Sequence, residues 1–126
     1  MTKTAIKERR QGVRKSVRSG IVALQDPNRP IEIGNVIDIS PDGLSCILPK
    51  EVSIDKSSHV KMDILLINDN IFLEGVSTEV ISDHVVSPSP MEQNNQVVLK
   101  RLGVKFNELE PSQARQLNRL SVSAFL

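Results

Sequence analysis

The arginines near the start of the chain are the first residues whose types and spacing could do chemistry. Arg9, Arg10 and Arg14 stand close together on a segment that Gly12 interrupts. On an extended chain Arg10 and Arg14 would lie roughly 13 Å apart. Guanidinium groups bond phosphate through two N–H groups, stack on purine faces and match the O6/N7 edge of guanine. The segment therefore predicts a clamp around an anionic ligand of nucleotide size.

A second polar cluster follows at Asp38, Ser40 and Gly43. Asp38 and Ser40 are two residues apart and should share one face of a strand. The carboxylate is either a counter-ion for the arginines or an acceptor for the N1–H and N2–H₂ groups of guanine. Gly43 stands where a positive φ, or the close approach of another group, would exclude a side chain. Taken alone, the triplet at 41–43 is typical of an ordinary β-turn.

Charge is unevenly distributed along the 126 residues, whose net charge is +1. Residues 1–18 hold seven Lys or Arg and one Glu, a balance of +6. Residues 19–126 hold nine Lys or Arg and fourteen Asp or Glu, a balance of −5. This asymmetry favours an anionic partner for the basic arm, although a solvated, self-repelling tail would also explain it.

The bulk composition indicates one domain and excludes several classes of protein. Cys46 is the only cysteine, so an internal disulfide is impossible and a four-ligand zinc site is disfavoured. No apolar run approaches the length of a membrane span, and no signal peptide is present, so a cytoplasmic protein is expected. His59 and His84 lack partners at any catalytic spacing and are expected at the surface or at strand ends. We therefore expect neither an enzyme nor a cofactor or metal.

Alternating apolar residues predict the strands of the first half of the chain. One strand should begin at Val13 and another at Ile31, with the turn 26–30 between them; a third should follow the turn at 41–43. The side chains expected to face inward are Val13, Val17, Ile21 and Ala23 in the first strand, Ile31, Ile33, Ile37 and Ile39 in the second, and Leu44, Cys46 and Leu48 in the third. This parity places Asp38 and Ser40 outward.

Three more strands are expected at 59–67, 71–85 and about 98–106, the second of them bent near Gly75. The residues that share one face are Val60, Met62, Ile64 and Leu66 in the first of these strands, and Val98, Lys100, Leu102, Val104 and Phe106 in the last. Pro111 then marks the start of a helix whose apolar stripe comprises Leu117, Leu120 and Ala124. Six antiparallel strands joined by short connections and followed by one helix indicate a mostly β fold, either a small closed barrel or a sandwich.

With the strand order in view, the two polar clusters resemble the two-part signature of PilZ domains, bacterial receptors for the second messenger cyclic di-GMP. The signature appears here as Arg10-x-x-x-Arg14 and Asp38-x-Ser40-x-x-Gly43. The stretch 101–106 (RLGVKF) resembles the family's late strand, and the Leu-rich helix resembles its usual ending. The resemblance covers about residues 8–121.

The resemblance implies a six-stranded antiparallel β-barrel with a C-terminal helix and a flexible basic N-terminal arm. Residues 1–8 would be a flexible tail and residues 9–126 a single domain. Cyclic di-GMP would lie on the outer surface of the barrel, wrapped by the N-terminal segment. In this scheme Arg10 and Arg14 bind guanine and phosphate groups, Asp38 and Ser40 contact the ligand from the barrel, and Gly43 permits the turn.

Arg9 adds a guanidinium group directly before the pair. Neighbouring side chains of an extended chain point to opposite sides, so Arg9 should face either solvent or a second layer of ligand. PilZ domains that resemble this one at that residue can bind a stacked cyclic di-GMP dimer. We therefore expect Arg9 in the ligand site and two ligands per chain.

Three functions are compatible with these features. The first is a cyclic di-GMP receptor and adaptor whose arm changes conformation on binding and signals to a protein partner. The second is a PilZ-like interaction adaptor that does not bind the dinucleotide, which the intact motifs disfavour. The third is nucleic-acid binding, which the 2% aromatic content disfavours because stacking platforms are missing. The expected partners are thus cyclic di-GMP and a protein effector, without a nucleic-acid polymer or membrane insertion.

Overall fold

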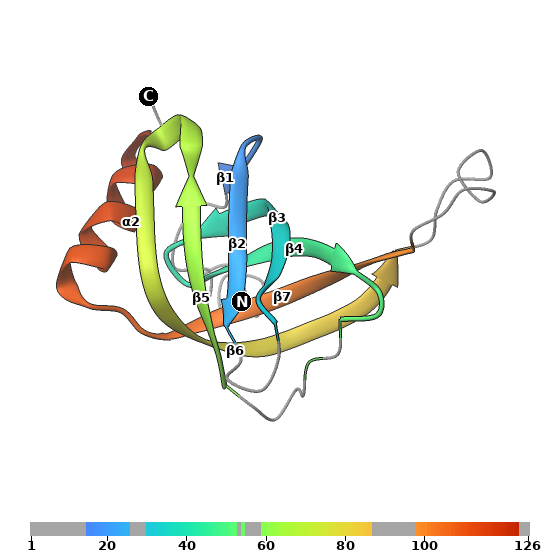
Figure 1. The fold of residues 1–126 in the computed structure, drawn as a ribbon. Helices are drawn as coiled ribbons and strands as arrows, with labels where there is room; N and C mark the ends of the chain where they lie inside the picture. Colours follow the sequence, from blue (N-terminus) through green and yellow to red (C-terminus); the bar gives the residue numbers. More distant parts are fainter. Residues whose placement is uncertain (1–14, 26–29, 53, 55–58, 87–97, 124–126) are drawn as a thin grey trace, which may run out of the picture.

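The computed structural model describes residues 15–25, 30–52, 54, 59–86 and 98–123. The described residues form seven strands, one 3₁₀ turn and one α-helix (Figure 1). Their bounds are β1 (Lys15–Ser16), β2 (Gly20–Gln25), β3 (Glu32–Ser40), β4 (Gly43–Pro49), β5 (His59–Leu66), η1 (Ile67–Asp69), β6 (Ile71–Val86), β7 (Leu99–Glu108) and α2 (Pro111–Ser123).

Six of these strands close into an antiparallel barrel. They follow the order β3-β2-β5-β6-β7-β4, and the pairing of β4 with β3 completes the circle. The two-residue strand β1 lies outside it and pairs with β3 beyond the end of β2. Closure leaves the six barrel strands without a free edge. The predicted six-stranded barrel with a C-terminal helix is therefore confirmed.

Alternation along the strands supplies the core. In β4 the residues predicted to face inward line the interior, and most of the face predicted for β5 and for β7 does so as well, as expected from a period of two. The largest fully buried side chains are Val22, Ile39, Leu44, Leu48, Met62, Ile64, Leu66, Leu73, Val76, Leu102, Val104 and Leu117. Aliphatic residues thus build nearly the whole core.

The prediction of one continuous strand up to Ala23, with Ile21 and Ala23 inward, is wrong. A bend separates β1 from β2, and the parity of the chain shifts by one residue across it. Val22 and Leu24 therefore fill the core, while Ile21 and Ala23 are only half-buried. The expected start of that strand, at Val13, lies outside the described residues.

The prediction that Ile31 and Ile33 face inward is also wrong. The register of β3 against β4 shifts between Val36 and Asp38, as it does at a β-bulge. An extra residue reverses which side chains face the core. Val36 before the shift and Ile39 after it are both buried, whereas Ile31 and Ile33 are exposed.

Gly75 produces the predicted bend in β6. Its φ of 64° is in the left-handed region, which residues that carry a side chain rarely adopt. The register between β5 and β6 shifts at this point, and the Gly75 N–H donates to Oδ1 of Asp63 on β5 at 2.8 Å. The bend lets the long strand β6 curve around the barrel (Figure 1).

The helix α2 begins at Pro111, as predicted, and buries Leu117 and Leu120. The side chain of Gln113 fixes its first turn. Its Oε1 accepts the Glu110 N–H at 3.0 Å, and its Nε2 donates to the Glu74 carbonyl at 3.0 Å. This arrangement satisfies one N–H at the start of the helix and ties the helix to β6. Ala124 lies outside the described residues.

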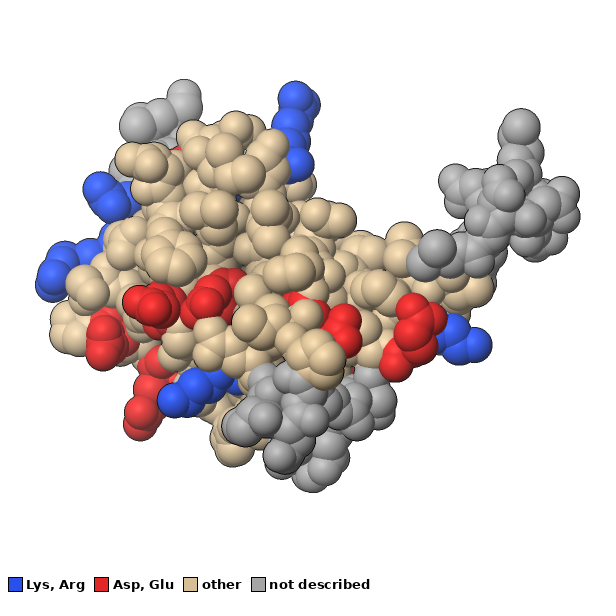
Figure 2. Space-filling view, viewed as in Figure 1, with Lys and Arg blue, Asp and Glu red and all other residues tan. Residues whose placement is uncertain are grey.

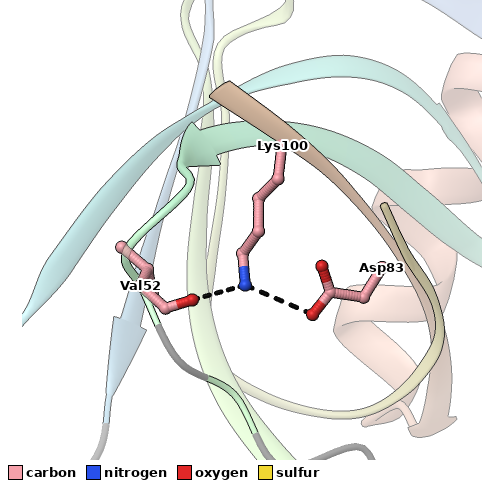
Figure 3. Close-up of polar contacts among 3 residues, drawn as sticks. All are labelled: Val52, Asp83 and Lys100. Atoms are coloured by element: carbon pink, nitrogen blue, oxygen red, sulfur yellow. Dashed lines mark hydrogen bonds and ion pairs between the residues drawn. The ribbon is translucent and has the colours of Figure 1, made fainter. Parts of the chain in front are cut away.

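A buried lysine occupies the barrel interior (Figure 3). Lys100 Nζ donates to the Val52 carbonyl and to Asp83 Oδ2, the latter at 3.2 Å. Cys46 is buried as well, and its burial raises the pKa of the thiol to about 12, although the charge of Lys100 acts in the opposite direction. Cys46 is therefore a small, neutral core residue. No described helix is long and apolar enough to cross a membrane.

Candidate functional site

The β3–β4 corner carries the second sequence motif. Ser40 and Gly43 pair directly, so Pro41 and Asp42 form a two-residue turn. Ser40 Oγ accepts the Asp42 N–H at 3.2 Å, and the Asp42 carbonyl accepts the Phe106 N–H at 2.8 Å. The turn is thus held both by its own hydroxyl and by β7.

Gly43 is required by the close approach of β7. A Cβ atom built on Gly43 would clash with the carbonyl oxygen of Val104 and lie 3.1 Å from Cα of Lys105. Among the described glycines, positive φ is confined to Gly75. Of the two explanations that the sequence left open for Gly43, backbone contact is the correct one.

Asp38 and Ser40 alternate with the inward-facing Ile39 and therefore face outward. Ser40 is largely buried, and only 17% of the Asp38 side chain is exposed. Asp38 Oδ2 accepts a hydrogen bond from Nη2 of Arg101 at 3.3 Å, across an ion pair in which the guanidinium is 40% exposed. Asp38 therefore presents a carboxylate at the surface, next to a cationic group of the barrel itself.

β1 brings the N-terminal part of the chain to this corner. Ser16 pairs with Asp38, and Lys15 pairs with Ile39. The chain directly after Arg14 thus runs beside the carboxylate of the second motif. Arg9, Arg10 and Arg14 themselves lie outside the described residues.

An ion pair fixes β1 from its other side. Lys15 Nζ lies 3.1 Å from Asp69 Oδ1 in the turn η1. A hollow of about 240 Å³ opens there, lined by residues 15–19, Asn68 and Asp69. Because β1 is held by both β3 and η1, the point at which the N-terminal segment meets the barrel is well defined.

Arg101 is a site residue that the sequence analysis missed. The alternation of β7 could have indicated that its side chain faces outward, since Lys100 and Leu102 face inward. Its position beside Asp38, 63 residues away in the chain, follows only from the order of β3, β4 and β7.

One face of the molecule is acidic in part. In the view of Figure 2, Asp and Glu side chains form a band across the face, and Lys and Arg lie mainly near its margins. This agrees with the negative balance of residues 19–126. An anionic ligand would be repelled from the band, so its binding depends on cationic groups gathered elsewhere.

The two histidines lie at the surface of the molecule. His59 and His84 are both exposed, as predicted, and Nδ1 of His59 lies 2.6 Å from Nδ2 of Asn107. Within the described ranges, no group of three or more His, Cys, Asp or Glu could hold a metal ion.

The family comparison covers nearly the whole chain. The model of the PilZ domain matches residues 8–123. The chain belongs to the PilZ domain family. This match confirms the resemblance drawn from the two motifs, and the matched range includes both motifs. No curated protein matches the sequence significantly.

Solved PilZ structures share the fold at low sequence identity. The PilZ domain of YcgR from Escherichia coli, solved with c-di-GMP, has a TM-score of 0.71 at 18% identity over 91% of this chain and 90% of that one. MrkH of K. pneumonia in its apo state has a TM-score of 0.71 at 12% identity, covering 90% of this chain and 50% of MrkH. PlzA of Borreliella burgdorferi in complex with c-di-GMP has a TM-score of 0.65 at 13% identity, covering 99% of this chain and 57% of PlzA. The chain thus spans about half the length of the two longer proteins.

Proposed function

We propose that this PilZ domain is a receptor for cyclic di-GMP, bound on the outer surface of the barrel at the β3–β4 corner. The observation that carries the proposal is the pairing of Ser16 with Asp38. It sets the end of the arginine-rich segment against the outward-facing motif, so groups from both motifs can reach one ligand. Membership of a family whose structural neighbours include complexes with c-di-GMP supports the same ligand.

Each residue of the two motifs binds a different part of the ligand. Arg10 and Arg14 supply charge-assisted hydrogen bonds to phosphate and guanine groups. Asp38 accepts from the donor edge of guanine, and the hydroxyl of Ser40 donates to a phosphate oxygen. Gly43 allows β7 to approach the turn, which keeps the corner compact. No step in this scheme requires catalysis.

Ligand binding also changes the conformation of the N-terminal arm. Residues 1–13 contain several like charges and few apolar groups, so we propose that the ligand orders them. The ordered arm and the bound dinucleotide form a surface that a protein effector reads. Amide hydrogen exchange along the arm tests this switch. Equally strong protection with and without ligand would contradict it.

Arg9 extends the proposal to stoichiometry. It follows the pattern of a residue that faces away from Arg10 and covers the purine of a second, stacked ligand. We expect calorimetry to give two ligands per chain for the wild type and one for Arg9→Leu, with unchanged melting curves. A wild-type stoichiometry of one would remove this role.

Calorimetry with cyclic di-GMP tests the receptor function directly. Arg10→Ala and Arg14→Ala should each abolish measurable binding, since one hydrogen bond to a charged group is worth about 1.5–3 kcal/mol, or about ten- to hundredfold in Kd. Lys7→Ala is the matched control, because it removes the same charge from the same segment but lies outside the motif. A random oligonucleotide should not bind.

The wild type decides between the receptor and its alternative. If the unmodified chain fails to bind cyclic di-GMP, the receptor function is wrong and the adaptor that works without the dinucleotide takes its place. If it binds and the two arginine variants bind equally well, the ligand is right but its site is wrong.

A further inference from the structure

Arg101 and Asp38 meet across an intervening strand. Asp38 on β3 pairs with Ser45 on β4, and Ser45 pairs with Gly103 on β7. Arg101 is two residues along β7 from that row, so its side chain must cross β4 to reach the carboxylate. Ser45 faces outward on β4 and is nevertheless only 8% exposed. The guanidinium therefore lies over the barrel surface at the floor of the proposed site.

The neighbouring outward cation of β7 behaves differently. Lys105 lies on the same face of the strand but pairs with Glu79 on β6, at 3.8 Å, and both side chains are about half exposed. Lys105 thus points away from the motif. Of these two outward cations of β7, Arg101 is the one that reaches the motif carboxylate.

An Asp–Arg pair of this kind complements one edge of guanine. Guanine presents N1–H, N2–H₂ and O6 side by side, and the first two are donors for a carboxylate. A guanidinium next to that carboxylate can donate to O6, since it carries five N–H groups in a planar fork. Adenine has a donor in place of O6 and an acceptor at N1, so the same pair would face it with unmatched groups.

We infer that Arg101 is a guanine-reading residue that donates to O6 of the base whose N1–H and N2–H₂ groups Asp38 accepts. This inference rests on the proposed cyclic di-GMP function. The exposure of the guanidinium supports it, because 40% of the side chain is open to solvent while it is held beside Asp38. A residue that served only to neutralise the carboxylate would instead compete with the base.

The test compares two ligands on three proteins. Calorimetry would measure the Kd of cyclic di-GMP, and of its inosine analogue that lacks only the 2-amino group, for wild type, Arg101→Ala and Lys105→Ala. Both ligands carry O6, so Arg101→Ala should weaken both by the same factor, about ten- to hundredfold. Lys105→Ala should leave both unchanged. Melting curves confirm that each variant is folded.

Each other outcome overturns the inference. A loss for cyclic di-GMP that shrinks with the inosine analogue would show that Arg101 only positions Asp38, which alone reads the 2-amino group. Unchanged or tighter binding by Arg101→Ala would make it a bystander or a competitor. Equal losses in Lys105→Ala would reduce the effect to general charge. Absence of binding by the wild type would overturn the receptor function and this inference together.

Discussion

Lys100 and Arg101 are neighbours on β7 and have the same charge, but they lie in opposite environments. Lys100 faces the barrel interior, where it is 6% exposed and bonded to Asp83 and to the Val52 carbonyl. Arg101 faces outward and pairs with Asp38, and 40% of its side chain remains exposed. Because successive side chains of a strand point to opposite faces, one cation lies in the core and the next lies at the surface site.

The two ion pairs differ in what their loss would cost. Removal of one partner from a buried pair leaves the other charge desolvated and uncompensated, which costs about 3–5 kcal/mol. Exposed pairs are worth about 0–1 kcal/mol, because water and salt replace the partner. The carboxylates of Asp83 and Asp38 are equally shielded, at 16% and 17% exposed, so the two pairs differ in their cations, which are 7% exposed in Lys100 and 40% in Arg101. Water can therefore take the place of Asp38 beside Arg101 more readily than the place of Asp83 beside Lys100.

Lys100→Ala should show the largest effect. We expect a loss of about 3–5 kcal/mol in the free energy of unfolding, because Asp83 and the Val52 carbonyl lose their partner. Chemical denaturation measures it. The double variant Lys100→Met with Asp83→Leu should recover the part of the loss that comes from the unpaired Asp83 carboxylate, while the Val52 carbonyl stays without its donor. If Lys100→Ala were as stable as wild type, the interior pair would have no structural role.

Gly43→Ala should reduce both the stability of the barrel and the binding of the ligand. The new Cβ clashes with the Val104 carbonyl oxygen, which belongs to backbone and cannot move aside easily. We expect a loss of about 1–3 kcal/mol from overpacking. Cyclic di-GMP binding should weaken in parallel, because the corner that holds Asp38 shifts. Gly75→Asn is a useful contrast, since asparagine tolerates its φ of 64° and the site lies elsewhere.

Asp38→Ala should affect ligand binding more than stability. It removes the carboxylate from the outward pair and should lower cyclic di-GMP affinity by about ten- to hundredfold. Stability should change by no more than about 1 kcal/mol, because the cation left behind, Arg101, is 40% exposed and water can solvate it. Calorimetry and denaturation on the same sample separate the two effects. A large loss of stability with unchanged binding would show that Asp38 serves the fold and not the ligand.

Cys46 should give the smallest effect at neutral pH. Burial raises the pKa of its thiol to about 12, from 9.0 for the free group, so the folded state favours the neutral form. Its contribution is fully present below pH 9.0 and is lost as the pH rises toward about 12, by at most about 1.4 kcal/mol per pH unit. Denaturation of wild type and Cys46→Ala across this range measures the difference in slope. Identical slopes would contradict a buried thiol.

Local patterns predicted much of the fold because they depend on neighbouring residues alone. The alternation of β4, β5 and β7, the bend at Gly75 and the helix start at Pro111 are all confirmed. Asp38 and Ser40 were placed outward for the same reason, through the inward position of Ile39. The two motifs could also be recognised in the sequence from their residue types and spacing, and this pattern indicated the family.

Long-range register was decided only by the tertiary structure. The bulge in β3 turns Ile31 and Ile33 to solvent, because pairing with β4 admits an extra residue that no local pattern reveals. The contact between Arg101 and Asp38 joins residues 63 positions apart through the strand order of a closed barrel. Side-chain periodicity determines which face a residue takes within a strand, whereas closure of the sheet determines which residues meet across that face.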